Sequence, residues 1–495
     1  MSQTRTESVE PAERPDPDPS PPQGPTPLPT EHKLLIGTLI VSCFVVILNE
    51  TVMSVAIPVL QTSLGVPPST GQWLTTAFLL TMGTVIPLTG YLIQRVPTRA
   101  LYVAAMSLFT AGTLLAFMAP GFGVLLVARI VQASGTAIML PLLMTTIMTV
   151  VPASRRGAMM GNVSVVIAVA PALGPTLSGV ILDHFGWRWI FGFVAPIAIV
   201  ALLVGARYVV AVAEPRHQRV DLLSVPLAVL GFGGLVYALV SVGESAQSQA
   251  HVPLWLPLGV GAAAMVAFLW RQIALQREDR ALLDLRVFGS RQFTLAMSAM
   301  VLGMMTMFGT FILLPLFAQQ VLEYGSTRTG LLTLPGGLLM GFAGPVVGRI
   351  YDARGARVLI VPGTLLVSAG VWALTGIDAQ TSMGWLIGAN ACIFLGLAAT
   401  FTPLMTSGLG SVPDHLYSHG SAVVSTFQQV AGAAGTALMV TVLTVVSAGT
   451  VEAGGTQTDG ITDGVQTAFT IAAVLSLVLI AVAFWVRKPA DASAR

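Results

Sequence analysis

Long apolar runs, each about the length of a bilayer crossing, follow one another from residue 34 to residue 487. Short segments rich in Pro, Gly and charge separate them, and a membrane-crossing helix needs about 20 apolar residues. The pattern predicts about fourteen helices, arranged as six, a central pair and six more. They are expected at 34–60, 72–93, 100–118, 122–148, 160–182 and 189–211, then 222–242 and 253–273, then 292–321, 328–350, 357–376, 383–406, 419–447 and 465–487.

Composition agrees with a chain that is solvated by lipid. Hydrophobic residues make up 54% of the 495 positions and charged residues only 9%, whereas soluble domains carry about 25% charged residues. The net charge of +2 gives no nucleic-acid footprint. Cys43 and Cys392 both lie inside apolar runs, which argues against a disulfide framework. The fold class expected is an all-α polytopic membrane protein.

Both ends of the chain differ from this apolar part. The segment from Pro11 to Pro29 is rich in Pro, Asp, Glu and Ser and has almost no aliphatic residues. Such a segment cannot bury enough apolar surface to offset its ordering entropy. We therefore expect a disordered tail over 1–33 and a second short tail over 488–495.

The distribution of basic residues predicts the orientation in the membrane. On a fourteen-helix path with a cytoplasmic N-terminus, eighteen Lys and Arg residues between Lys33 and Lys488 fall on the inner side and only Arg188 and Arg328 on the outer side. Basic residues favour the cytoplasmic side of a membrane protein. A multi-pass plasma-membrane protein with both termini in the cytoplasm is expected. The inner segment 407–418 is an exception, since it contains no Lys or Arg.

An internal repeat divides the chain. The segment Gly90–Arg99 resembles Gly348–Arg357, with glycines and terminal arginines aligned at an offset of 258 residues (348 − 90). The offset places the first six helices in correspondence with the last six and leaves the central pair as an insertion. Transporters built this way bind substrate between the halves near the bilayer midplane. The divisions expected are 34–213 for the first half, 214–291 for the inserted pair and its linker, and 292–487 for the second half.

Glu50 is the only acid well inside a predicted span, and Arg129 is the only base there. An ionised carboxylate at the bilayer centre costs about 2.5–3.5 kcal/mol, so Glu50 must face protein or water. Desolvation favours the neutral carboxyl, which suits a proton carrier. At about 1.5 Å per residue the two side chains lie at similar depths, so they can face each other. Two alternatives stay open: a permanent structural pair, or an Arg129 that only bonds to backbone carbonyls.

Glycines, prolines and one acid carry candidate mechanical roles. Gly174 and Pro175 can bend a helix and bring its neighbour close, although generic packing explains such residues equally well. For the glycines between 336 and 348, packing is the favoured interpretation. Asp352 lies beside three arginines, Arg349, Arg354 and Arg357. It is either a latch between conformations or an ordinary solvated acid.

Four stretches together resemble the major facilitator superfamily, in its fourteen-helix drug:proton antiporter branch. They are Leu48–Pro58, with Glu50 where most members carry Asp; Gly90–Arg99, with Gln94 in place of the family acid and Pro97 in place of a glycine; Arg129–Gly135; and Ala170–Gly179, which is similar to the motif that accompanies export.

The resemblance implies an alternating-access antiporter with proton coupling at Glu50 and Arg129. The conformational motifs that it implies include Gly90, Arg95, Arg99, Gly174, Pro175, Gly179, Gly348, Asp352 and Arg357. Because Gln94 replaces an acid, any gating ion pair of the first half is in doubt, while Asp352 retains its counterpart in the second half.

The substrate pocket is expected among polar or amphipathic residues within helices: Asn49, Trp73, Gln132, Gln319, Asn390, Gln428 and Gln429. With 20 Met and 21 Phe in the chain, an adaptable apolar pocket is plausible. No phosphate-binding loop is present, so an ion gradient must drive transport. We expect no cofactor and no metal, with protons, a small lipophilic substrate and membrane lipid as partners, and a functional monomer.

The function predicted is export of small lipophilic drugs or antibiotics in exchange for protons. One alternative is a dedicated exporter of a single metabolite or self-made antibiotic. The other is a membrane-embedded lipid-modifying enzyme, which would need paired acids or a histidine at one membrane face.

Overall fold

The computed structural model describes residues 29–66, 68–211, 221, 223–246, 255–278 and 280–486. Over these ranges the chain forms fourteen α-helices and four short 3-10 helices. The α-helices are α1 Thr30–Leu64, α2 Pro68–Arg95, α3 Thr98–Phe117, α4 Phe122–Val150, α5 Arg156–Phe185, α6 Arg188–Tyr208, α7 Ser224–Ala246, α8 Trp255–Leu275, α9 Arg291–Gln320, α10 Ser326–Arg354, α11 Arg357–Ala373, α12 Met383–Gly410, α13 Tyr417–Glu452 and α14 Gln457–Ala483.

The described part of the chain is an all-α polytopic membrane protein, as the apolar runs predict. Twelve of its helices are long and apolar enough to cross a membrane. The other two helices, α7 and α11, are not among these twelve. The tails predicted over 1–33 and 488–495 lie outside the described residues, except for the segment from residue 29 onward.

Helix α14 begins eight residues before the start predicted at residue 465. Its first turns are polar, so the hydropathy pattern assigns them to a loop. The structure places a capping box there: the Thr456 hydroxyl accepts from the Asp459 amide, and the Asp459 carboxylate accepts from the Thr456 amide. Because these bonds satisfy amides that a helix start leaves free, the helix extends into the polar segment.

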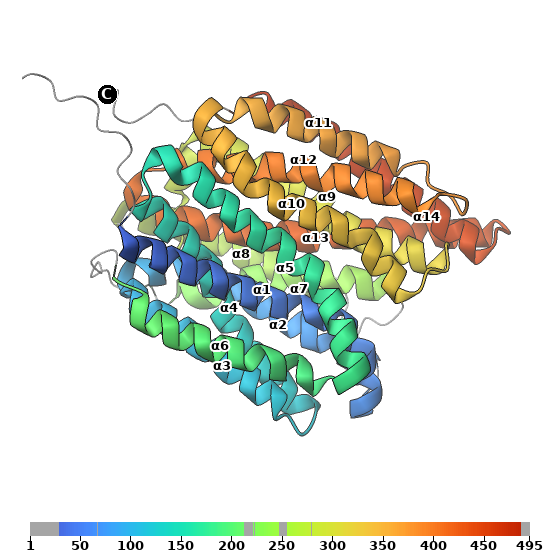
Figure 1. The fold of residues 1–495 in the computed structure, drawn as a ribbon, viewed down its shortest axis with the longest axis horizontal. Coiled ribbons are helices and arrows are strands. Elements are labelled where there is room, and N and C mark those ends of the chain that lie inside the picture. The colour runs from blue at the N-terminus through green and yellow to red at the C-terminus, as the bar shows by residue number, and fades with distance from the viewer. Residues whose placement is uncertain are drawn as a thin grey trace, which may run out of the picture.

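The helices run side by side along the long axis of the molecule and form two groups (Figure 1). Helices α1 to α6 pack mainly against one another, and we call them the first bundle. Helices α9 to α14 pack in the same way and form the second bundle. The bundles meet where α5 packs on α10 and where α2 packs on α13, while the α7–α8 pair packs through α7 on both α2 and α13.

Small residues allow the α5–α10 contact to be close. A side chain at Gly161 would overlap the Gly344 carbonyl, and one at Gly348 would overlap the Gly157 carbonyl. Glycines at helix crossings permit this backbone approach in membranes. The glycines of α10 that the sequence assigns to packing do pack: those at 337, 341, 344 and 348 pack against α5 of the other bundle, and Gly336 packs against α12 of its own bundle.

The chain segments between α2 and α3, α4 and α5, α10 and α11, and α12 and α13 meet at one end of the molecule. Hydrogen bonds join the last turn of α2 to the start of α13, and the last turn of α10 to the start of α5. We call this end the arginine-rich end, because its side chains include Arg95, Arg99, Arg155, Arg156, Arg349, Arg354 and Arg357.

Candidate functional site

The Glu50 carboxyl group lies where the two bundles meet. It is half-buried on α1, in the middle of an unbroken helix. Its carboxyl interacts electrostatically with Arg129 on α4 and also interacts with the side chain of Gln429 on α13. Gln429 belongs to the second bundle, whereas Glu50 and Arg129 belong to the first. A change in the charge of Glu50 therefore acts on a contact within one bundle and on a contact between the two.

Side chains of the first bundle hold the Arg129 guanidinium. Arg129 is 1% exposed, and its Nη1 donates to Gln132 Oε1 at 3.1 Å. Gln132 is fixed in turn by donating to Thr113 Oγ1 at 2.9 Å. The guanidinium also stacks over the Phe78 ring, 4.0 Å from its centroid. This hydrogen bond goes to a side chain rather than to a backbone carbonyl, and the Glu50 carboxylate supplies the countercharge that a buried cation requires.

Helix α5 packs on α1 one residue away from Glu50. A side chain at Gly174 would overlap Thr51 Oγ1, which itself donates to the Leu48 carbonyl at 3.0 Å. The backbone of α5 is therefore closely packed against α1 at Gly174. It is not closely packed at Gly179, where a side chain would meet open space. Pro175 lies within α5, and the structure does not describe its side chain.

Asp352 connects the bundles at the arginine-rich end. Its two carboxylate oxygens accept hydrogen bonds from the Gly157 and Ala158 amides, at 2.8 and 2.9 Å. Those amides belong to the first turn of α5, where the helix dipole is positive and free N–H groups attract an anion. Asp352 thus acts as a charged cap on a helix of the opposite bundle. The sequence suggests the neighbouring arginines as partners of Asp352, and it does not predict the contact with the N-terminus of α5.

Gln94 occupies the corresponding place between α2 and α13. Its Nε2 donates to the His415 carbonyl at 3.1 Å and to Ser418 Oγ at 2.8 Å. One turn earlier, a side chain at Gly90 would come within 3.1 Å of His419 Nδ1. Arg95 donates to the hydroxyl of Tyr91 on its own helix. The other two motif arginines, Arg99 and Arg357, lie exposed at the starts of α3 and α11.

Three further hydrogen bonds between the bundles were not predicted. The hydroxyls of Ser164 and Thr402 lie 2.6 Å apart, and those of Thr145 and Ser421 are also bonded. The third bond joins Arg156 to the Tyr417 hydroxyl at 3.1 Å. Short polar side chains in apolar helices give little sequence signal, because each can also bond to its own helix. Together with Asp352 and Gln94, they hold the bundles together at the arginine-rich end.

The seven pocket candidates do not form one group. Gln429 contacts Glu50 and Gln132 contacts Arg129, while Asn49 is fully buried and its amide has no hydrogen-bond partner among the described residues. The remaining four lie elsewhere: Trp73 stacks on Tyr237 of α7, Asn390 donates to the Thr333 carbonyl, Gln428 contacts the Met300 sulfur, and Gln319 is exposed near the end of α9.

A family model described as Major Facilitator Superfamily matches residues 39–436 of the chain. The chain belongs to this superfamily. It is therefore a membrane transporter and not an enzyme, which removes the lipid-modifying alternative. The superfamily includes relatives that align over nearly the whole chain. One is the MFS-type transporter YcnB of Bacillus subtilis, 38% identical over 93% of this chain and 96% of the relative.

A second relative carries a resistance name. It is the lincomycin resistance protein LmrB of Listeria monocytogenes, 37% identical over 92% of this chain and 96% of its own length. Among solved structures, the human organic anion transporter MFSD10 superposes with a TM-score of 0.64. The alignment covers 92% of this chain and all of that one at 13% identity, so it supports the superfamily fold alone.

Proposed function

We propose that this protein is a proton-coupled antiporter that exports small lipophilic drugs or antibiotics by alternating access. The observation that carries the proposal is the Glu50 carboxyl group, placed between the Arg129 cation of one bundle and the Gln429 amide of the other. The 37% identity to a lincomycin resistance protein supports a drug as substrate. The match of residues 170–179 to the export motif supports the direction.

Protonation of Glu50 couples the proton to the conformational change. While ionised, the carboxylate attracts Arg129 and the Gln429 amide, so it favours the arrangement in which these groups are close. Once protonated, it has no net charge to hold Arg129, and its attraction to the second bundle weakens. Arg129, kept in place by Gln132 and Phe78, restores the ionised form when the proton leaves. Substrate and proton compete because both occupy the junction of the bundles.

Alternating access requires the bundles to rock about this junction. The proposed units are residues 34–213 and 292–487, with the α7–α8 pair and its linker at 214–291 as an insertion. All fourteen helices would cross the plasma membrane, which places both termini and the arginine-rich end in the cytoplasm. The hydrogen bonds of Asp352, Gln94 and Arg156 would then close the cytoplasmic side. The unit of transport is one copy of the chain.

Inverted membrane vesicles test the transport proposal. Vesicles that contain the protein are energised and offered lincomycin, several lipophilic cations and unrelated antibiotics, with and without a proton uncoupler. We expect uptake of several of these compounds, abolished by the uncoupler. Uptake of one compound alone would favour a dedicated exporter, and uptake unaffected by the uncoupler would refute proton coupling.

Cysteine labelling tests the orientation. Ser154 and Thr456 are both exposed, at opposite ends of the molecule. With Cys43 and Cys392 replaced by serine, a cysteine at 154 should react only from the cytoplasmic side and one at 456 only from outside. Reaction of both from one side would refute the fourteen-crossing path.

A further inference from the structure

The α7–α8 pair contacts both bundles. Helix α7 packs on α2 of the first bundle and on α13 of the second. On the α2 side, Trp73 stacks on Tyr237 with ring centroids 5.9 Å apart, and a side chain at Gly83 would touch Val236 at 3.3 Å. The pair thus lies beside the α2–α13 contact, opposite the α5–α10 contact. Motion of α2 against α13 cannot leave it unaffected.

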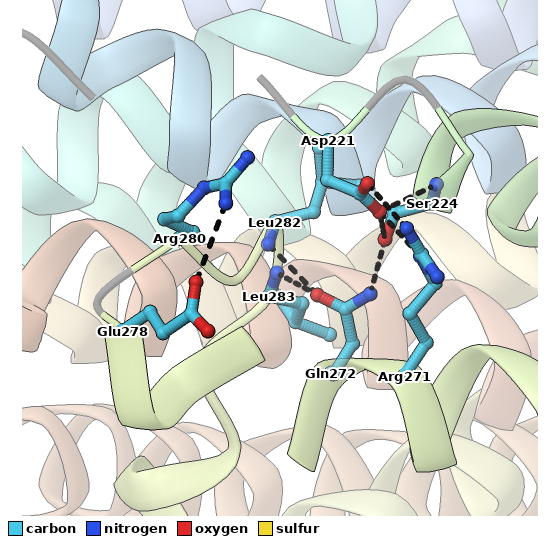
Figure 2. A network of polar contacts seen from close by, with 8 residues as sticks. All are labelled: Asp221, Ser224, Arg271, Gln272, Glu278, Arg280, Leu282 and Leu283. Carbon is cyan, nitrogen blue, oxygen red and sulfur yellow. Dashed lines mark hydrogen bonds and ion pairs between the residues drawn. The ribbon is translucent and has the colours of Figure 1, made fainter. Parts of the chain in front are cut away.

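A partly buried polar network joins the start of α7 to the end of α8 (Figure 2). Arg271 donates through Nε and Nη2 to the two oxygens of Asp221, both at 2.6 Å, and the Ser224 amide donates to the same carboxylate at 3.0 Å. These hydrogen bonds, the one from Arg271 foremost, hold the pKa of Asp221 well below its usual range. The bidentate pair therefore stays charged at physiological pH, and it fixes the two helix ends relative to each other.

Gln272 extends this network to the chain segment that leads into the second bundle. The residue is fully buried, and its Nε2 donates to Ser224 Oγ at 2.8 Å. Its Oε1 accepts from the amides of Leu282 and Leu283, at 2.7 and 3.2 Å (Figure 2). One side chain therefore binds the helix pair on one side and the linker backbone on the other. The neighbouring Arg280–Glu278 pair is exposed at 3.3 Å and adds little.

The opposite side of the same linker reaches the α2–α13 corner. His419 on α13 interacts with the Leu282 main chain. The His419 side chain is 5% exposed and lies against Gly90 of α2. The Leu282 main chain is therefore hydrogen-bonded to Gln272 and also contacts His419. A continuous set of buried contacts leads from α8 through the linker to the corner between the bundles.

We propose that Gln272 is a positioning residue for the cytoplasmic gate, through which the α7–α8 pair holds the α2–α13 corner closed. The inference rests on the proposed alternating-access function. In the closed state, Gln272 keeps the linker in contact with His419, and His419 keeps its place against Gly90. When α2 and α13 separate, His419 moves, and the linker must move with it or lose this contact. Each bond from Gln272 to the linker therefore stabilises the closed state.

Distances between spin labels test this role. Ala100 on α3 and Val358 on α11 are exposed at the arginine-rich end, one on each bundle. Cysteines at these positions, in a variant without Cys43 and Cys392, report how far apart the bundles lie there. Gln272→Leu removes all three hydrogen bonds. We expect it to raise the population of the longer distance about threefold to tenfold, which corresponds to the loss of one or two net hydrogen bonds.

Two further variants separate positioning from general destabilisation. Gln272→Glu retains oxygen acceptors for the linker amides and loses only the donation to Ser224, so it should shift the distances less than Gln272→Leu does. Gln466→Leu is the matched control, because Gln466 also bonds to the main chain, donating to the Ile377 carbonyl at 2.8 Å, but lies outside the network that holds the linker. It should leave the distances unchanged. An equal shift in Gln466→Leu, or no shift in a folded Gln272→Leu, would overturn the proposal.

If Gln272→Leu does not fold, the same distances are measured in Ser224→Ala, and this variant tests the proposal instead. It removes the acceptor that orients the Gln272 amide while leaving the linker amides bonded, and we expect a smaller shift in the same direction; unchanged distances would overturn the proposal.

The distance measurement needs neither substrate nor a proton gradient. A wild type with one fixed distance under all conditions would refute alternating access, whereas two distances that Gln272→Leu does not redistribute would refute only the role of Gln272.

Discussion

At the arginine-rich end, a charge holds the corner between α10 and α5, and an amide holds the corner between α2 and α13. Asp352 accepts from two amides at the start of α5, and Gln94 donates to a carbonyl and a hydroxyl at the start of α13. The two residues are separated by the same offset as Gly90 and Gly348. The internal repeat has therefore kept the geometry of the corner in both halves and changed its chemistry.

The difference predicts unequal strength. An anion at a helix start gains from the helix dipole and from charge-assisted bonds, whereas a neutral amide in a half-exposed position gains only about 0.5–1.5 kcal/mol per bond. The helix packing next to the two hydrogen-bonded residues also differs. At Gly348 the backbone of α10 contacts the backbone of α5, whereas at Gly90 the backbone of α2 contacts the His419 side chain of α13. We infer that the α10–α5 corner is the stronger contact and that the α2–α13 corner depends on additional contacts, including those of the linker.

Among variants at these two corners, the largest effect is expected for Gly348→Ala. Its new methyl group would overlap the Gly157 carbonyl, which cannot rotate away. Overpacking of this kind costs about 1–3 kcal/mol, so the bundles should separate and the export rate should fall about tenfold or more. Gly90→Ala meets His419 and Ala422 at 3.1 to 3.2 Å and should be tolerated better. The export rates of the two variants are measured in inverted vesicles and normalised to the amount of folded protein. An equal loss of rate in both variants would contradict the difference in packing.

Asp352→Asn should have the next largest effect. The variant keeps the shape and loses the charge at the α5 terminus, an interaction worth about 0.3–2 kcal/mol. We expect slower export, by about threefold to tenfold, with substrate affinity unchanged, because the residue acts on the balance between conformations. Asp378→Asn, in the exposed segment between α11 and α12, is the control. Weaker binding with unchanged access would count against Asp352 as a latch.

The smallest effect is expected for Gln94→Leu. The variant removes two neutral hydrogen bonds, each worth about 0.5–1.5 kcal/mol when buried and less where water competes. Export should change by no more than about fivefold, and by less than in Asp352→Asn. The same vesicle assay measures it. A loss as large as that of Asp352→Asn would show that the amide corner is as strong as the charged one.

Hydropathy predicts the helices well because lipid imposes their length and composition. The start of α14 is the instructive exception. Its first residues are polar, and only the pairing of Thr456 with Asp459 reveals a helix there. A hydropathy profile does not take such local hydrogen bonds into account.

The candidate site was only partly predictable. The sequence predicts that Glu50 and Arg129 face each other, because they lie at similar depths and few other ionisable residues lie in the spans. The choice of Gln429 among several amides was not predictable, since it depends on how the second bundle lies against the first. Phe78 and the α5 terminus were missed for the same reason. Their contacts join segments that are distant in the chain, and no local pattern marks them.

The central claim is that Glu50 carries the coupled proton, and Glu50→Gln tests it most directly. Glutamine keeps nearly the shape of the side chain but has no titrating proton, and the loss of a buried charge should not prevent folding. In proteoliposomes with an imposed proton gradient, we expect the variant to lose concentrative export while it still exchanges labelled for unlabelled substrate, and Glu50→Asp to retain partial export. Concentrative export by the Gln variant would contradict the account and leave Glu50 with a structural role.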